Sequence, residues 1–378
     1  MNMLYITEDY IGSRVHHNLC EALANADNKL KITLLNIERP NYPLRDLRPT
    51  YTNINYELKQ AQFKGNLLIY RTFFPYKIAQ KLKLLHQNID VKNTDLVVAS
   101  TLFSDGAVAL NLWKKFKIPY VVAVRGTDVN LYLQHMPHLY SLGRQIIANA
   151  KRVIFVSPSH MQQTLQSHVF CSIANILKQK SLLITNGIDQ IWIDNQHFNT
   201  KNRIPNSVLY VGIFDRNKNV GRLIDACKKL KLTIPNLTLN LVGGGGDCEQ
   251  EISSQISDNQ DWIKFHGAIY DKQKLIEIFR RNAVFAMVSH SETFGLVYLE
   301  ALTQGLPIIY TENQGFDNVN NNLQVGYAAN SNNVSDIAAK LEMALKNREN
   351  LLLDIQKIDF SAFSWQKKAS DWLNAIKI

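Results

Sequence analysis

The segment 283–310 constrains the fold of this chain more than any other part of the sequence. The apolar run 283–289 is typical of a buried strand, and a short loop and a helix follow it up to residue 304. Gly305 and Pro307 then end the helix before a second apolar run at 308–310. A strand, a helix and a second strand in this order predict a parallel βαβ unit.

The same alternation of strand-like and helix-like runs continues along the whole chain, which favours an α/β protein with parallel sheets. Its 378 residues suit two domains better than one. We predict a first domain over 1–188, a polar linker over 189–206 and a second domain over 207–358. The segment 40–65 is irregular and gives no clear element.

Composition excludes several classes of protein. The four cysteines are scattered without a CxxC pair, so we expect a reduced cytoplasmic protein without a disulfide framework or a metal site. No apolar run approaches the roughly 20 residues that span a bilayer. The first residues, MNMLYITEDY, are typical of a strand and not of a secretory signal. The net charge of +10 comes without a nucleic-acid motif, and it fits an enzyme that handles nucleotide diphosphates beside an anionic membrane.

Two glutamates stand at the helix that follows the run 283–289. A helix beginning near Phe294 directs its free N–H groups at the preceding loop, which is a suitable place for a phosphate. Glu292 lies in that loop and is placed to reach a sugar attached to the phosphate, whereas Glu300 lies within the helix and is placed to reach a ribose. Ionised carboxylates accept hydrogen bonds from paired hydroxyls. The alternative is an ordinary amphipathic helix with two solvated glutamates.

This constellation resembles a known signature. Glu292, Phe294-Gly295 and Glu300-Ala301 stand as in the retaining glycosyltransferases with two Rossmann-like domains (GT-B), family four in particular. The resemblance implies two Rossmann-like domains that face each other across a cleft. It also implies that a last helix, within 359–378, crosses back onto the first domain.

The activity that the resemblance implies is transfer of a sugar from a nucleotide diphosphate sugar to a hydroxyl. The acceptor is expected to be a glycan or a lipid-linked molecule in surface polysaccharide biosynthesis, and transfer is expected to proceed with retention and without a metal. We expect no cofactor besides the nucleotide sugar as co-substrate, and no nucleic-acid partner. A nucleotide-sugar epimerase on the same fold, or a non-catalytic nucleotide-sugar-binding partner, remains an alternative.

The resemblance also assigns roles to residues of the second half. Lys218 matches a lysine that contacts the donor diphosphate, but Ile213 stands where the family has an arginine, for which Arg216 is a candidate substitute. Glu292 and Lys218 are the catalytic candidates of this half. The expected donor-binding residues are Gly212, Arg216, Lys218, Gly243, Gly267, Ile269, Glu292, Phe294, Gly295, Leu296 and Glu300.

The first half carries three further candidates. Gly12 stands where the family has a glycine-rich loop that faces the donor phosphates and the acceptor. Arg125 and Asp128 match a segment at the end of a strand that borders the cleft, with Arg125 at the usual histidine position, and both are further catalytic candidates. Arg125 cannot serve as a base, but it can neutralise a phosphate or an acidic sugar. The alternative is an arginine paired with Asp128 for structure.

The segment 71–86 contains aromatic residues followed by lysines among apolar residues. Such a helix can lie on a membrane surface, which would place the protein at the inner face of the membrane. An ordinary amphipathic surface helix is the alternative.

Overall fold

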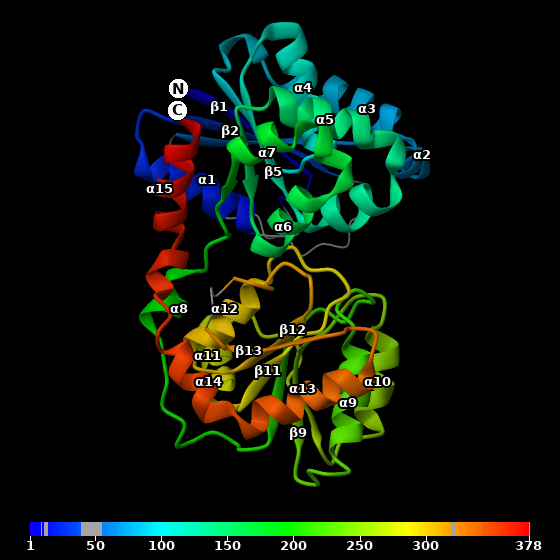
Figure 1. The fold of residues 1–378 in the computed structure, drawn as a ribbon, viewed down its shortest axis with the longest axis vertical. Coiled ribbons are helices and arrows are strands. Elements are labelled where there is room, and N and C mark those ends of the chain that lie inside the picture. The colour runs from blue at the N-terminus through cyan, green and yellow to red at the C-terminus, as the bar shows by residue number, and fades with distance from the viewer. Residues whose placement is uncertain (9, 11–13, 39–54, 320–322, 378) are drawn as a thin grey trace. The chain divides into compact units, whose positions relative to one another are not determined.

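The computed structural model describes residues 1–8, 10, 14–38, 55–319 and 323–377. The chain divides into two compact units, Met1–Gly187 with Trp365–Ile378 and Ile188–Ser364. Each unit is an α/β structure around a parallel sheet, as the alternation predicted (Figure 1). The segment 189–206, predicted as a linker, counts with the second unit and includes the short helix α8, Gln190–Asp194.

The sheet of the first unit has the order β3-β2-β1-β4-β5-β6-β7 among the described residues, and all its pairs are parallel. Its strands are β1 Asn2–Thr7, β2 Lys31–Glu38, β3 Tyr56–Gln62, β4 Leu96–Ala99, β5 Tyr120–Val124, β6 Arg152–Phe155 and β7 Ser181–Leu183. The chain lays down β2 and β3 on one side of β1 and then returns to its other side with β4. The order in which the chain adds strands therefore reverses between β1 and β4, and this is the topological switch point of the sheet.

The segment 40–65, for which the sequence predicted no clear element, contains a strand in its second half. Residues 39–54 lie outside the described part of the chain, but 56–62 form β3, which pairs with β2. This strand lies at the edge of the sheet and buries only Tyr56 and Ala61 among its seven residues. An edge strand of this kind lacks the apolar run by which the other strands were predicted.

The helices of the first unit connect successive strands. They are α1 Val15–Ala26, α2 Leu67–Thr72, α3 Phe74–Asn88, α4 Ser104–Phe116, α5 Tyr140–Asn149, α6 Pro158–Gln166 and α7 Ala174–Lys180. The last helix, α15 Trp365–Ile376, belongs to this unit and packs along α1, so the chain does return to its first unit (Figure 1). Trp365, Trp372 and Leu373 are among the side chains that α15 buries.

The second unit has the sheet order β10-β9-β8-β11-β12-β13 among its described residues, again with parallel pairs. Its strands are β8 Ser207–Gly212, β9 Thr238–Gly243, β10 Ile263–Phe265, β11 Val284–Ala286, β12 Ile308–Thr311 and β13 Gly326–Ala329. Besides α8, its helices are α9 Val220–Leu230, α10 Glu249–Ser257, α11 Lys272–Arg281, α12 Leu296–Thr303, α13 Val334–Lys346 and α14 Arg348–Ile355.

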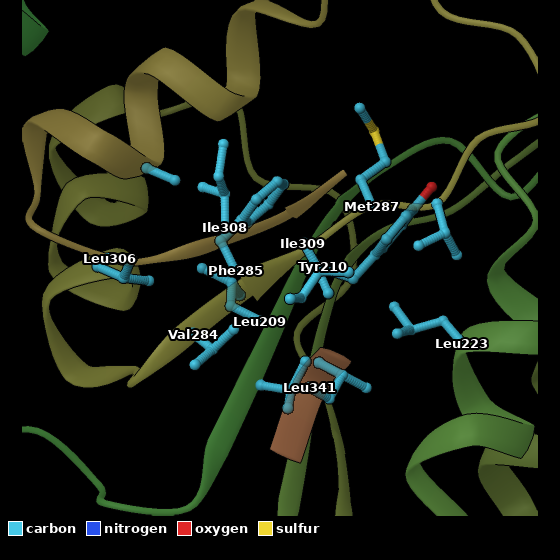
Figure 2. Packing of buried hydrophobic residues seen from close by; sticks show 14 of the residues in the cluster. Leu209, Tyr210, Leu223, Val284, Phe285, Met287, Leu306, Ile308, Ile309 and Leu341 are labelled. Atoms are coloured by element: carbon cyan, nitrogen blue, oxygen red, sulfur yellow. The ribbon is translucent and has the colours of Figure 1, made fainter. Parts of the chain in front are cut away.

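The core of the second unit lies between this sheet and its helices. Leu209, Phe285 and Ile308 from three neighbouring strands belong to one buried cluster with Leu341 of α13 and Leu223 of α9 (Figure 2). These strands are apolar on both faces because helices cover both faces of a parallel sheet. The carboxyl ends of the strands thus rest on a rigid core, and the loops that leave them are held in place.

Candidate functional site

The sheet of the second unit has its topological switch point, where the strand order reverses, between β8 and β11. From β8 the chain proceeds to β9 and β10 on one side, and from β11 it proceeds to β12 and β13 on the other. In open parallel sheets, ligands bind outside the carboxyl ends of the strands at such a point. The loop after β8 carries Lys218 and the loop after β11 carries Glu292, so the sheet order brings the two predicted residues together.

Lys218 and Glu292 form an ion pair. The Lys218 Nζ lies 2.7 Å from the Glu292 Oε2. The Lys218 side chain is 23% exposed and that of Glu292 is 14% exposed, so both reach solvent from a largely buried position. The backbone N–H of Lys218 donates to the Asp215 Oδ1 over 2.7 Å, which fixes the loop before α9. The pair is a preformed combination of one cation and one carboxylate at the switch point.

Asn217 joins the two loops, and sequence reasoning missed it. Its side-chain amide donates to the Ser291 carbonyl and accepts from the Ser291 N–H, both over 2.9 Å. The N–H of His290 also donates to the Asn217 carbonyl over 2.8 Å. These three hydrogen bonds set the distance between the loops and hence the position of Lys218 beside Glu292. An asparagine in the loop that also holds Lys218 was the only signal in the sequence.

Gly295 determines how α12 begins. Its φ of 79° lies in the left-handed region, and an added Cβ would lie 2.4 Å from the ring of Tyr298. The helix therefore begins at Leu296, and not near Phe294 as the sequence predicted. The side chain of Phe294 is buried against Phe316, so this predicted donor-binding residue offers a ligand only its backbone. Leu296 packs partly buried against the core.

Glu300 lies further along α12 and is partly buried. Its carboxylate accepts no hydrogen bond from the described residues. Burial raises the pKa of the Glu300 carboxyl to about 8, and the negative charge of Asp189 adds to this shift while Lys272 opposes it. Asp189 and Lys272 form an ion pair of their own. The sequence did not predict these two neighbours, which come from the start of α8 and the start of α11.

The glycine turn after β9 packs against the loop after β8. A Cβ on Gly243 would lie 1.7 Å from the carbonyl oxygen of Gly212, so the two predicted glycines allow a close approach of backbones. The N–H of Gly243 donates to the Gly267 carbonyl over 2.9 Å, which ties in the turn after β10. Ile269 follows in that turn, and it is partly buried against the core.

Arg216 does not lie with Lys218 and Glu292 in the structure. Its backbone N–H donates to the Asp247 Oδ1 over 2.9 Å, and its Nε lies 3.4 Å from the Asp247 Oδ2. Ile213, at the position where the resemblance leads to an arginine, has an exposed side chain. The loop after β8 therefore presents Lys218 toward Glu292 and Arg216 toward the glycine turn.

In the first unit, Asp128 is fully buried and holds backbone groups. Its Oδ2 accepts from the N–H groups of Leu102 and Arg125 over 2.9 and 3.0 Å, and its Oδ1 accepts from Phe103 over 3.1 Å. Burial raises its pKa to about 6 although these N–H groups act in the opposite direction. The carboxylate thus clamps the ends of β4 and β5 and is no group that a substrate reaches. Gly12 lies outside the described residues.

The guanidinium of Arg125 is held separately from Asp128. Its Nε donates to the carbonyl of Ser100 over 2.8 Å, which places it at the carboxyl ends of β4 and β5. The Ser100 hydroxyl in turn donates to the Asp105 Oδ2 over 2.8 Å. Arg125 is partly buried and keeps its position at the edge of the first sheet where ligands of such sheets bind.

A buried charged network at the switch point of the first sheet was not predicted. Lys81 is fully buried, and its ammonium contacts Asp105, the Glu8 Oε1 at 2.7 Å and the Ser104 hydroxyl at 3.0 Å. These carboxylates raise the pKa of Lys81 although burial alone would lower it. Lys77 lies 3.2 Å from the Glu8 Oε2. The signal was the spacing of Ile78, Lys81 and Leu85, which puts Lys81 on the buried face of α3.

The described residues contain neither a metal-binding cluster nor a membrane-spanning helix. Within this part of the chain, no group of three or more His, Cys, Asp or Glu is placed to hold a metal ion. None of the helices described here is long and apolar enough to cross a membrane.

Comparison with known proteins agrees with this geometry. Residues 193–357 match the model of the family Glycosyl transferases group 1. The matched residues lie within the second unit. An uncharacterized glycosyltransferase of Methanocaldococcus jannaschii is 26% identical over 296 residues, which cover 77% of this chain and 76% of that protein. The prediction of a glycosyltransferase enzyme is therefore confirmed.

Solved structures confirm the fold. Sucrose-phosphate synthase from Thermosynechococcus elongatus is similar with a TM-score of 0.73 and 18% identity, over 100% of this chain and 98% of that chain. The Anabaena protein HepE in complex with UDP-glucose is similar with a TM-score of 0.63 and 16% identity, over 100% of both chains. The predicted architecture of two Rossmann-like domains, GT-B, is thus the observed one.

Proposed function

We propose that this protein transfers a sugar from a nucleotide diphosphate sugar to a hydroxyl of a glycan or lipid-linked acceptor. The observation that carries the proposal is the Lys218–Glu292 ion pair at the switch point of the second sheet. A cation for a diphosphate and a carboxylate for a sugar stand there side by side, and the family match covers both residues. The similar Anabaena structure is a complex with UDP-glucose.

When the donor binds, Lys218 and Glu292 contact different parts of it. Lys218 turns from Glu292 to the diphosphate and, with the first N–H groups of α12, stabilises the negative charge that develops on the leaving group. Glu292 then accepts hydrogen bonds from hydroxyls of the transferred sugar. This exchange of partners explains why an ion pair occupies the site before the donor arrives.

Glu300 binds the ribose of the donor. Its carboxylate has no hydrogen-bonding partner among the described residues, and two vicinal hydroxyls would supply two donors. The neighbouring pair Asp189–Lys272 sets its electrostatic surroundings. Gly212, Gly243 and Gly267 border the site through their backbone.

The reaction proceeds with retention and without a metal in this proposal. We favour a front-face reaction in which the leaving phosphate accepts the acceptor's proton, so that positioning and charge stabilisation of the leaving group carry the catalysis. Arg125 assists turnover from the first unit, and Asp128 positions the loop that carries it. The acceptor belongs to a surface glycan assembled at the inner face of the membrane.

A thermal-shift panel of UDP-, GDP- and ADP-sugars tests the proposal, because a ligand that binds only the folded state raises its melting temperature. We expect one nucleotide family to stabilise the wild-type protein and Lys218→Met to lose most of that shift. Lys264→Met, an exposed lysine in the same unit, is the matched control. A protein that no sugar nucleotide stabilises contradicts the donor site. A protein that isomerises the donor without an acceptor is an epimerase.

A further inference from the structure

Three large apolar side chains lie exposed within six residues of the first unit. Leu68 is 70% exposed, Ile69 is 43% exposed and Phe73 is 58% exposed. Single exposed apolar residues are common, but a contiguous group is typical of a binding surface. We call these three residues the α2 surface. Figure 1 shows α2 at the margin of its unit, next to α3.

Two other aromatic residues of the same segment anchor it. Tyr70 and Phe74 are buried, and the Tyr70 ring packs on Phe63 with centroids 4.3 Å apart. The apolar character of the α2 surface is therefore not needed for the core, which has its own aromatic residues at this point. The chain holds one set of apolar side chains inside and presents a second set to the outside.

The charged residues in the sequence around the α2 surface are all basic. The sequence 63–88 contains five lysines and arginines and neither an Asp nor a Glu. Lys64 and Lys83 are exposed. Lys77 and Lys81 are paired with Glu8, which comes from outside this stretch. Exposed apolar side chains among exposed cations, without acids, complement an anionic lipid surface.

Hydrogen bonds and ion pairs connect the α2 surface to the edge of the first sheet that the carboxyl ends of β1 and β4 form. The Tyr70 hydroxyl donates to the Glu8 Oε1 over 2.9 Å, and Lys77 of α3 is paired with the same carboxylate. Glu8 directly follows β1, at the switch point of that sheet. A body bound at the α2 surface is thereby held close to this edge.

We propose that the α2 surface docks on an anionic lipid bilayer and so brings a lipid-linked acceptor to the edge formed by β1 and β4. Delivery of the acceptor rests on the proposed function, whereas the docking on the bilayer does not depend on it. Leu68, Ile69 and Phe73 enter the boundary between headgroups and acyl chains. Lys64 and Lys83 remain at the headgroups, where the anionic lipids attract them.

Co-sedimentation with vesicles tests the docking. The full chain is mixed with vesicles of phosphatidylcholine alone or with a third of phosphatidylglycerol. We expect binding to the mixed vesicles, and little to the neutral ones. The variant Leu68→Ser/Ile69→Ser/Phe73→Ser should bind at least roughly tenfold more weakly because apolar burial is lost. Lys64→Glu/Lys83→Glu should lose about fivefold for each cation.

Leu232→Ser is the matched control, because Leu232 is 83% exposed on the second unit and lies outside the α2 surface. It should bind as the wild type does. Equal binding to both vesicle types, no binding to either, or equal losses in the control and the triple variant would overturn the proposal. A wild-type dimer in solution that the triple variant dissociates would also overturn it, because the occupant would then be a second copy.

Sugar transfer separates this proposal from the proposed function. A wild-type protein that transfers sugar to a water-soluble acceptor but does not bind vesicles overturns the docking alone. A wild-type protein that binds vesicles as expected but transfers no sugar overturns the proposed function alone. The triple variant should keep transfer to the soluble acceptor and lose transfer to a lipid-linked one.

Discussion

Replacing Glu300 by Gln should remove a pH dependence from nucleotide binding. Burial raises the pKa of the Glu300 carboxyl to about 8, so most of the ligand-free protein carries it protonated near neutral pH. A ribose that binds the ionised carboxylate therefore binds only the minor fraction of the protein in which Glu300 is deprotonated. The apparent dissociation constant is then the intrinsic one divided by the ionised fraction.

The magnitude follows from that pKa. The ionised fraction rises from about 3% at pH 6.5 to about 76% at pH 8.5, which makes binding up to roughly 25-fold tighter over this interval. Because the Glu300 side chain is only partly buried, the observed gain should lie below this limit. Calorimetric titration of the preferred nucleoside diphosphate at several pH values measures it. The ligand's own titration is common to the wild-type protein and Glu300→Gln and cancels in their ratio.

Stability provides a second assay of the same carboxyl. A carboxyl whose pKa is raised in the folded state stabilises the fold below its ordinary pKa, and this contribution is lost as the pH rises toward 8. The melting temperature of Glu300→Gln relative to the wild type should therefore be higher at pH 8.5 than at pH 5. Nucleotide affinities with the same pH profile in both proteins would refute the assignment of Glu300 to the ribose.

Three other variants test the geometry. Lys81→Met leaves Asp105 buried without its cation and Glu8 with Lys77, and should cost roughly 3–5 kcal/mol in the free energy of unfolding, measured with denaturant; an unchanged value contradicts the network. Gly295→Ala forces a residue with a Cβ to a φ of 79° and should lower the free energy of unfolding by roughly 1–3 kcal/mol; an unchanged value contradicts this start of α12. Arg125→Ala should lower turnover more than donor affinity; equal losses in kinetics and calorimetry would make it a donor clamp.

The second unit was largely predictable because its chemistry is local in sequence. Glu292, Gly295 and Glu300 lie within nine residues, and the glycine and proline that end the helix follow directly. The start of α12 was placed two residues too early because the left-handed conformation of Gly295 depends on the packing of Tyr298 beneath it. Such a contact leaves little trace in the pattern of apolar residues.

The rest of the site depends on contacts between distant segments. Asn217 and Ser291 are 74 positions apart, and nothing in either loop reveals the other. Lys81 looked like one of several surface lysines of α3, and only the carboxylates of Glu8 and Asp105 explain its burial. The spacing of Ile78, Lys81 and Leu85 indicates the buried face of α3, but no pattern in the sequence reveals which carboxylates pair with Lys81 there.

The central claim is that Glu292 holds the transferred sugar while Lys218 holds the diphosphate. Product formation and diphosphate affinity, measured on the same preparation of Glu292→Gln, test it most directly. The replacement keeps the size of the side chain and removes its charge. We predict that transfer falls by orders of magnitude, while calorimetry finds diphosphate affinity unchanged or higher because Lys218 is released from its ion pair. Full transfer activity in this variant would contradict the claim.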